Sequence, residues 1–263
     1  MARPIAFKKD LPSFLECQAV PQMAQALADP FFAEILFDQL ADVVFFVKDT
    51  DGCYVVVNHT LMQRCGCRRK SELIGHSPLD VFPAELGASY TSQDQYVIRS
   101  GRAMHNQLEL HLYTNQTPCW CLTHKIPLFD GEGQIIGLAG ISKDVQMPDK
   151  NHPVYQRIAD VVAYIQKNYA EQMKLERLAR IGGMSVTQLE RHIQRIFQLT
   201  PKQLIIKVRI EAAIRLLLER ERSIADIAYA CGYADHSAFS RQFKVVVGIS
   251  PTDYRRLLSQ KFA

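Results

Sequence analysis

Residues 224–243 read IADIAYACGYADHSAFSRQF, and residues 175–193 read LERLARIGGMSVTQLERHI. The apolar, glycine and arginine positions of the earlier stretch recur in the later one. The matched pairs are Leu175/Ile224, Leu178/Ile227, Ala179/Ala228, Gly183/Gly232, Met184/Tyr233, Leu189/Phe239, Arg191/Arg241 and Ile193/Phe243. The first five pairs lie 49 residues apart and the last three 50 apart. Each copy predicts a short helix, a tight glycine turn and a second helix, which is the pattern of a helix-turn-helix unit.

Helix-start signals place the elements around the two copies. Ser185, Ser223 and Asp235 are good N-cap residues, and Pro201 occupies the first position of the next helix, where proline is favoured. That helix, from Pro201 to about Glu219, joins the two units. Units held by such a connector can enter two successive major-groove segments on one face of a duplex, roughly 34 Å apart.

The charge of the chain is divided unevenly. Its 263 residues carry a formal net charge of +4, but residues 1–150 hold 13 Lys/Arg against 17 Asp/Glu, and residues 151–263 hold 18 against 10. A basic C-terminal half is what binding of a polyanion requires. Prolines 148 and 153 break the periodicity between the halves. We therefore expect an N-terminal helical flank at 1–37, a mixed domain at 38–146, a linker at 147–154 and a DNA-binding domain at 155–263.

The N-terminal half alternates between strand-like and helix-like segments. Val43–Val47 and Cys53–Val57 predict two strands around a hairpin turn at residues 49–52. Short helices follow over 61–86, a longer helix over 92–100, and three strands near 105–113, 118–128 and 134–143. The expected fold class is α+β, with a five-stranded antiparallel sheet and short helices, followed by an all-α domain with two helix-turn-helix motifs.

These segments resemble two known families. Residues 38–146 resemble PAS sensory domains through residues 46–52 (FVKDTDG), 55–58 (VVVN), 72–75 (ELIG), 81–83 (VFP) and 125–128 (KIPL). Residues 155–258 resemble the AraC/XylS family of bacterial transcription regulators. The signature residues are Ile227, Ala228, Gly232, Tyr233, Ser237, Phe239, Arg241, Phe243, Lys244, Gly248, Ser250, Pro251, Tyr254 and Arg255. The first unit departs from the family pattern at Ile193, where Phe is common, and at Gln198, where Gly is common.

The AraC/XylS resemblance implies base contacts at positions on the first recognition helix. These are Thr187, Glu190, Arg191 and Gln194. On the second recognition helix the polar residues that face outwards are His236, Ser237, Ser240 and Arg241. Arginine can bond guanine bidentately. For each of these residues, and for Lys202 and Arg209 on the connector as phosphate contacts, the alternative is a solvated helix face.

Strand alternation leaves two readings of the sheet. Burial alone points the apolar residues Leu108, Leu110, Trp120 and Leu122 inward. The PAS resemblance implies the opposite, with a second subunit or the stretch Phe31–Leu40 covering that apolar face. The ligand-binding residues it implies are Phe46, Lys48, Glu109, His111, Cys121, Thr123, Lys125 and Ser142. Such a cavity would suit a small polar molecule, such as a carboxylate; the alternative is an internally paired polar cluster.

We therefore expect a regulator that binds promoter DNA and whose PAS domain senses a small molecule. The alternative is a constitutive DNA binder that uses the PAS domain only to dimerise. RNA polymerase and a second copy of the chain, bound through the N-terminal half, are the expected protein partners. No apolar run suggests a signal peptide or membrane span, so the expected location is the cytoplasm, with no membrane partner. The chain is not expected to be an enzyme, and no cofactor or metal is expected. The pairs Cys65/Cys67 and Cys119/Cys121 are either inert thiols or a metal or redox site.

Overall fold

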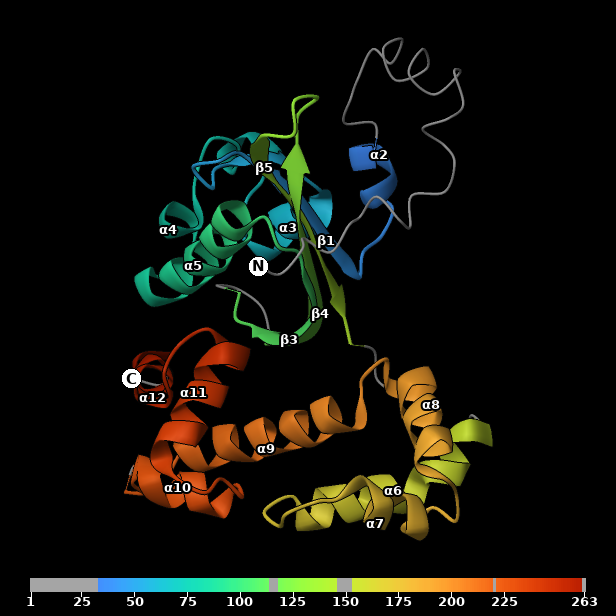
Figure 1. The fold of residues 1–263 in the computed structure, drawn as a ribbon. Coiled ribbons are helices and arrows are strands. Elements are labelled where there is room, and N and C mark those ends of the chain that lie inside the picture. The colour runs from blue at the N-terminus through green and yellow to red at the C-terminus, as the bar shows by residue number, and fades with distance from the viewer. Residues whose placement is uncertain (1–32, 114–117, 146–152, 220, 262–263) are drawn as a thin grey trace, which may run out of the picture.

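The chain folds into two domains that lie one above the other (Figure 1). The computed structural model describes residues 33–113, 118–145, 153–219 and 221–261. We call residues 33–145 the sheet domain and residues 153–261 the helical domain. Residues 1–32 of the predicted flank (1–37) and most of the predicted linker (147–154) lie outside the described residues.

A single antiparallel sheet organises the sheet domain. Its strands are β1 (Val43–Lys48), β2 (Tyr54–Val57), β3 (Met104–His111), β4 (Cys119–Phe129) and β5 (Ile135–Asp144). Their order is β2-β1-β5-β4-β3, and the α+β prediction is confirmed. The predicted hairpin turn is also present, because the Asp49 carboxylate accepts hydrogen bonds from the N–H groups of Asp51 and Cys53 at 3.0 and 2.9 Å. Gly52 supplies the left-handed residue of this turn, with φ +85°.

Short helices accompany the sheet. They are α2 (Ala33–Phe37), α3 (His59–Arg64), the 3₁₀ turn η3 (Lys70–Glu72), α4 (Pro78–Val81) and α5 (Ala84–Ser100). The prediction that the long helix begins near residue 92 was wrong, because α5 begins at Ala84. Gly87 weakens the helical signal there. Its presence has a packing reason, since a Cβ at this position would lie 2.6 Å from the carbonyl oxygen of Pro78.

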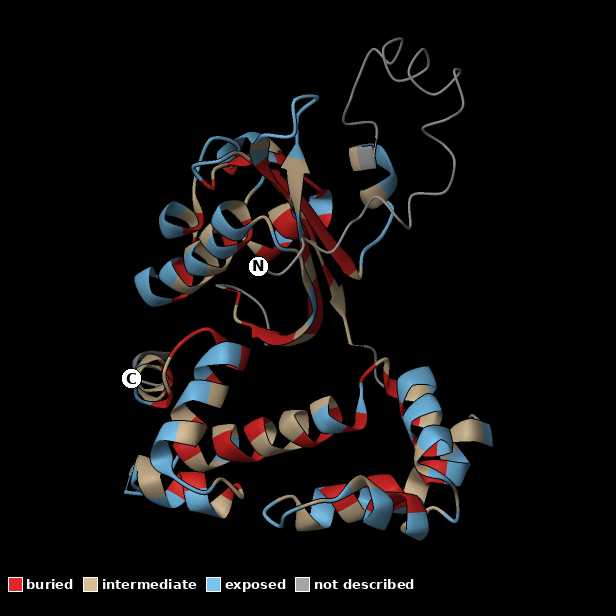
Figure 2. Ribbon diagram, in the orientation of Figure 1, coloured by how far each residue is buried: buried red, intermediate tan, exposed pale blue. Residues whose placement is uncertain are grey.

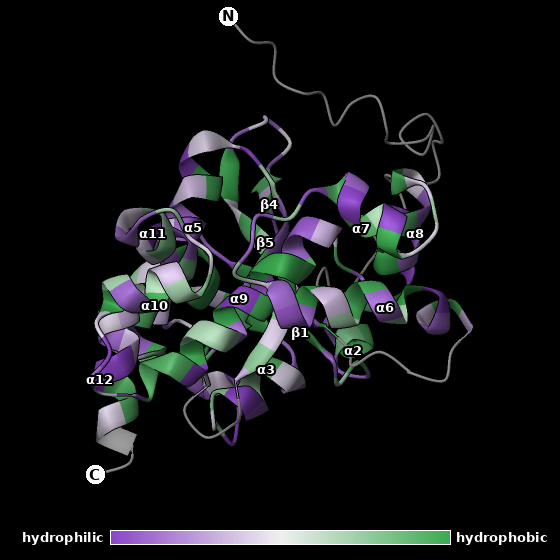
Figure 3. Cartoon of the chain, turned by 90° about the horizontal axis from the view of Figure 1, so that it is seen from below, coloured by the Kyte–Doolittle hydropathy of each residue, from purple (hydrophilic) through white to green (hydrophobic). Residues whose placement is uncertain are grey.

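Seven helices form the described part of the helical domain. They are α6 (Pro153–Asn168), α7 (Leu175–Ile181), α8 (Val186–Phe197), α9 (Pro201–Leu217), α10 (Ile224–Ala230), α11 (His236–Val247) and α12 (Pro251–Lys261). The predicted N-caps are confirmed, since the side chains of Ser185, Ser223 and Asp235 accept hydrogen bonds from backbone N–H groups at the starts of α8, α10 and α11. Figure 3 shows hydrophilic residues interleaved with hydrophobic ones along α6 and α8, as expected of amphipathic helices.

The outer face of β3 and β4 is covered by the helical domain. Leu108 and Leu122 belong to one buried cluster with residues of α6 to α9, and Leu110 belongs to another with residues of α9 to α12. Figure 2 shows the buried lower part of β3 above α9. The apolar face therefore points outward, but its cover differs from the expected one. In the described part of the expected flank, Phe37 stacks on Phe45 of β1 with ring centroids 4.2 Å apart, while Ile35 and Leu36 are exposed.

Candidate nucleic-acid interface and sheet-domain cavity

The first recognition helix, α8, is clearly two-sided. Leu189 and Ile193 are fully buried and anchor the helix in the core. The four residues predicted to contact DNA are all exposed on the other side, namely Thr187, Glu190, Arg191 and Gln194. A capping box holds the start of the helix, with Ser185 and Gln188 exchanging hydrogen bonds at 3.2 and 2.9 Å. The helix thus presents a polar face on a fixed frame.

The second recognition helix, α11, repeats this design. Phe239 and Phe243 are fully buried, whereas His236, Ser237 and Arg241 are exposed and Ser240 is half-buried. The Ser240 hydroxyl lies 3.3 Å from Nε2 of His236 one turn earlier.

Helix α9 and one arginine fix the two units relative to each other. The 17 residues of α9 span about 25 Å, with α8 at one end and α10–α11 at the other (Figure 1). Arg209 of α9 donates hydrogen bonds to the backbone carbonyls of Tyr169 and Glu171 at 2.8 and 2.9 Å. These bonds give Arg209 a structural role, and its contact with a phosphate stays a prediction. The same segment touches the second unit, because a Cβ on Gly232 would lie 2.4 Å from the carbonyl oxygen of Ala170.

Basic groups surround the exposed face of α8. Partial burial and the nearby guanidinium groups of Arg191, Arg157 and Arg195 lower the pKa of His192. A positive environment around a polar recognition face favours the phosphates of a nucleic acid.

Comparison with protein families agrees with this geometry. Residues 178–257 match the model of a helix-turn-helix domain, and residues 37–150 match the model of a PAS fold. The chain joins a PAS domain to an AraC-type helix-turn-helix domain. The helix-turn-helix match spans both units found in the sequence, and the PAS match contains nearly the whole sheet domain.

The curated relatives match the helical domain. RhaS of Enterobacter sp. (strain 638), a transcriptional activator, is 30% identical over 100 residues, which are 38% of this chain and 36% of RhaS. The melibiose operon regulatory protein of Escherichia coli (strain K12) is 32% identical over 104 residues, 40% of this chain and 34% of that protein. The chain thus spans about a third of the length of these relatives, which are transcription regulators and not enzymes.

A solved structure covers the same part of the chain. The C-terminal domain of AraT, a response regulator from Geobacillus stearothermophilus, has 33% sequence identity and a TM-score of 0.38, covering 41% of this chain and 88% of that chain. As for membranes, no helix among the described residues is long and apolar enough to cross one.

The PAS domain contains a small cavity of about 40 Å³. Seven of the eight residues predicted as ligand contacts line it, namely Phe46, Lys48, Glu109, His111, Thr123, Lys125 and Ser142. Cys121 lies outside the lining, one strand repeat beyond Thr123, and its Sγ approaches Asp144 instead. The volume corresponds to about three water molecules, well below the several hundred Å³ of a drug-sized ligand site.

Charged groups inside this cavity are paired with one another. Asp94 of α5 receives Lys48 Nζ at 2.5 Å and Lys125 Nζ at 2.6 Å on its two carboxylate oxygens. Glu109 lies 3.0 Å from Nε2 of His111 and accepts from the Thr123 hydroxyl at 2.5 Å. The cluster is therefore internally paired, as the alternative predicted, and it also lines a cavity; binding of a ligand stays a prediction.

Burial sets the protonation of this cluster. It lowers the pKa of Lys48 to about 8, although the carboxylate of Asp94 partly compensates. For Asp94 burial acts in the opposite direction, but the charges of Lys125 and Lys48 prevail and lower its pKa. Burial therefore destabilises the charged form of Lys48.

Sequence reasoning missed Asp94. This aspartate is fully buried, which is rare for a carboxylate unless it is paired. A signal was available, because Asp94 lies four residues after Tyr90 and three before Val97 on the inward stripe of α5. The position of both lysines opposite that stripe is a tertiary feature and is not visible in the spacing.

Direct contacts join the PAS domain to the connector helix α9 and to α11 of the second helix-turn-helix unit. The Gln107 side chain donates to the carbonyl of Val245 near the end of α11 at 3.4 Å, and Gln203 of α9 donates to the carbonyl of Asn106 at 2.8 Å. Lys207 of α9 lies over the Trp120 ring, 5.4 Å from its centroid. The contacts on α11 lie at its C-terminal end, away from His236 and Ser237 at its start.

Proposed function

We propose that the chain is a sequence-specific DNA-binding transcription regulator. The observation that carries the proposal is the pair of exposed polar faces, on α8 and α11, fixed at the two ends of α9 in an AraC-type domain. Arg191 and Arg241 occupy matching positions on these faces, and arginine is the side chain best suited to reading guanine in the major groove. Promoter DNA is the partner, and RNA polymerase is the protein that such a regulator engages.

Selection of binding sites from a library of randomised duplexes tests this proposal. The full-length protein should enrich a bipartite site with two elements about one helical turn apart. Binding should weaken steeply with salt, since lysine and arginine contacts to phosphate release counterions. Enrichment of no motif, with equal affinity for all duplexes, would contradict sequence-specific binding.

For the PAS domain, we propose that the cavity binds a small carboxylate and thereby modulates DNA binding or activation. Two buried lysines share the single carboxylate of Asp94. An added carboxylate would give Lys48 a second counter-ion and would offset the burial that lowers its pKa. The size of the cavity favours the shortest acids, formate and acetate.

A thermal-shift titration with formate and acetate tests the ligand proposal. We expect stabilisation at pH 7 that weakens above about pH 8, where Lys48 loses its charge. The response should disappear in Lys48→Met and persist in Lys143→Met, a β5 lysine that does not line the cavity. If no short acid shifts the intact protein, the constitutive alternative, with the PAS domain as a dimerisation module, replaces this proposal.

We also propose that the chain forms a homodimer through its N-terminal half. The support is the exposed apolar surface of α2, where Ile35 and Leu36 are 64% and 63% exposed. The double substitution of both residues by aspartate should lower the mass measured by light scattering. Leu218→Asp, at a 54% exposed position of the helical domain, should not. An unchanged mass in the double variant would exclude this surface.

A further inference from the structure

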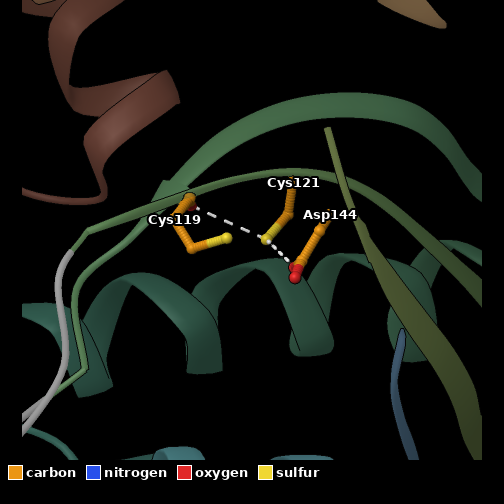
Figure 4. Close-up of side chains that lie close together, drawn as sticks. All are labelled: Cys119, Cys121 and Asp144. Atoms are coloured by element: carbon orange, nitrogen blue, oxygen red, sulfur yellow. Dashed lines mark hydrogen bonds between the residues drawn. The ribbon is translucent and has the colours of Figure 1, made fainter. Parts of the chain in front are cut away.

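Two cysteines of β4 lie together beside a carboxylate. Cys119 and Cys121 are two positions apart, so both side chains lie on the same face of the strand. Their Sγ atoms and the Asp144 carboxylate on β5 all lie within 4.8 Å of one another (Figure 4). Cys121 is fully buried, whereas Cys119 is only half-buried. The pair is thus compact, and Cys119 is the more exposed of its two residues.

The carboxylate next to the thiols is already neutralised. Arg64 of α3 donates to both oxygens of Asp144 at 2.9 and 2.6 Å. A divalent metal would have to displace this bidentate ion pair and approach a guanidinium. The surroundings therefore favour thiol chemistry over metal binding.

The two sulfurs are not equivalent. The Cys121 thiol lies 3.6 Å from the Cys119 carbonyl and 3.5 Å from Asp144 Oδ1, and it donates to both oxygens. The neighbouring Cys121 thiol lowers the pKa of Cys119, and Arg64 adds to this effect, while burial and Asp144 oppose it. The neighbouring Cys119, burial and the Asp144 carboxylate raise the pKa of Cys121. Cys119 therefore ionises more readily than Cys121 and is also the more exposed of the two, so Cys119 is the attacking thiol and Cys121 the resolving one.

We propose that Cys119 and Cys121 are a modification site for hydroperoxides, which oxidise the pair to a disulfide. The Cys119 sulfur attacks one oxygen of hydrogen peroxide; an S–O bond forms, the O–O bond breaks and hydroxide leaves. The Cys121 sulfur then attacks the sulfur of the Cys119 sulfenic acid, the S–O bond breaks, and the hydroxyl leaves as water with the thiol proton of Cys121. The two thiols lose two electrons, and the peroxide, with the proton originally on Cys119, is reduced to two molecules of water.

Closing this disulfide must bend β4. Residues two apart on a strand have Cα atoms about 6.4 to 6.8 Å apart, at the upper limit of about 6.8 Å for a disulfide, whose usual value is about 5.5 to 6 Å. The residue between the two cysteines in the sequence is Trp120, whose side chain lies on the opposite face of the strand. Its carbonyl accepts a hydrogen bond from Val145 at 2.7 Å, and its ring faces Lys207 of α9. Oxidation is therefore transmitted to the contact between the PAS domain and the connector of the two helix-turn-helix units.

Mass spectrometry of the reduced full-length chain treated with hydrogen peroxide tests the chemistry. The peptide that contains both cysteines should lose two hydrogens. Cys121→Ser should stop at a sulfenic acid that a dimedone probe traps on Cys119, and Cys119→Ser should not react there.

The Cys65/Cys67 pair is the matched control, since burial raises the pKa of Cys65 to about 12 and also raises that of Cys67. We expect Cys119 to react at least about tenfold faster than Cys65, because one pKa unit changes the thiolate fraction tenfold, and faster than Cys67, whose pKa is also raised. Equal rates at both pairs, or no disulfide at Cys119, would overturn the proposal.

A second measurement distinguishes formation of the disulfide from its effect on the contact between the two domains. Trp120 is the only tryptophan of the chain, so its fluorescence reports on β4 directly. It should change on oxidation of the wild type and of Cys67→Ser, and stay constant in Cys119→Ser. A disulfide that forms without any change in this signal would overturn the proposed effect on the domain contact. The DNA-binding experiments described above fail or succeed independently of both readouts.

Discussion

Arg191 stands on the solvent side of α8, one turn of helix from the exposed Thr187 and next to Glu190. Within the part of the chain that the structure describes, its guanidinium makes no hydrogen bond or ion pair, so its removal leaves no group in the core without a partner. Arg191→Ala should therefore leave the free energy of unfolding unchanged and weaken binding to the selected operator by about 1–3 kcal/mol, the usual value of a bidentate base contact.

Fluorescence anisotropy with the operator duplex measures this effect. Lys167→Ala, on an exposed position of α6, is the matched control and should bind normally. An affinity of Arg191→Ala equal to that of the wild type would remove Arg191 from the interface.

Glu109 makes the stability of the PAS domain depend on pH. Burial disfavours its ionised form, but the hydrogen bond and charge of His111, helped by Lys125 and Thr123, lower its pKa from 4.5 to about 2. The folded chain thus binds fewer protons than the unfolded chain between these values. The resulting stabilisation is complete above about pH 4.5 and is lost as the pH falls towards 2.

Glu109→Gln should lower the free energy of unfolding at neutral pH by about 1–3 kcal/mol, because charged acceptors are replaced by a neutral amide. Urea unfolding at a series of pH values should also show a shallower loss of stability between about pH 5 and pH 3 than in the wild type. Parallel pH profiles for the two proteins would show that Glu109 does not titrate in this way.

At the scale of elements, the two recognition helices α8 and α11 end in the same backbone conformation but with different residues at the C-cap. Gln198 ends α8 with φ +56°, and Gly248 ends α11 in the same left-handed region with φ +90°. A residue with a side chain is destabilised in this left-handed region by about 1–2 kcal/mol. Replacing it by glycine removes this strain, but glycine has more conformational freedom in the unfolded chain, which offsets part of the gain.

Gln198→Gly should accordingly raise the free energy of unfolding by about 0.5–1 kcal/mol. Arg195→Gly, in the interior of the same helix, should lower it by about 1 kcal/mol. Chemical denaturation of both variants gives the comparison. Destabilisation by Gln198→Gly would mean that the glutamine side chain contributes more than its strained backbone costs.

Elements governed by local chemistry were predictable from sequence. The caps at Ser185, Ser223 and Asp235 and the turn at Gly52 depend on neighbours within a few residues. The start of α5 was not predictable in this way, because Gly87 is required by its contact with Pro78 and not by the helix itself. Of the cavity, the strand positions followed from the PAS pattern, whereas Asp94 did not, because its pairing depends on how α5 lies across the sheet.

At the scale of the whole molecule, the two domains share buried surface and not merely a tether. Leu86 of α5 packs at Gly248, where an added Cβ would lie 3.1 Å from Leu86 Cδ2. Gly248→Ala should therefore be strained both by its φ and by this contact, and it should lower the free energy of unfolding by about 1–3 kcal/mol. Gly183→Ala, also at positive φ but with nothing within 4 Å, should cost less.

A double-mutant cycle isolates the contact between the domains. In a Leu86→Ala background the crowding is gone, so Gly248→Ala should cost less than in the wild type. An interaction free energy of about 0.5 kcal/mol or more is typical of residues in contact. Strict additivity would show that the two domains do not meet at this point in solution. The docking itself could not be predicted, because the outer leucines of β3 are equally compatible with a flanking helix, a second subunit or another domain.

The unbroken helix α9, clamped by Arg209, also has a consequence for the genome that such a protein reads. A rigid spacer cannot adapt when the distance and the rotation between the two half-sites of the DNA change. One base pair inserted between the two half-sites of an operator would move the second by about 3.4 Å and rotate it by about 34° around the duplex, given about 10.5 base pairs per turn. Half a turn of insertion would put it on the opposite side, whereas a flexible pair of readers would tolerate both. The spacing between half-sites should therefore be as invariant across its promoters as the bases themselves.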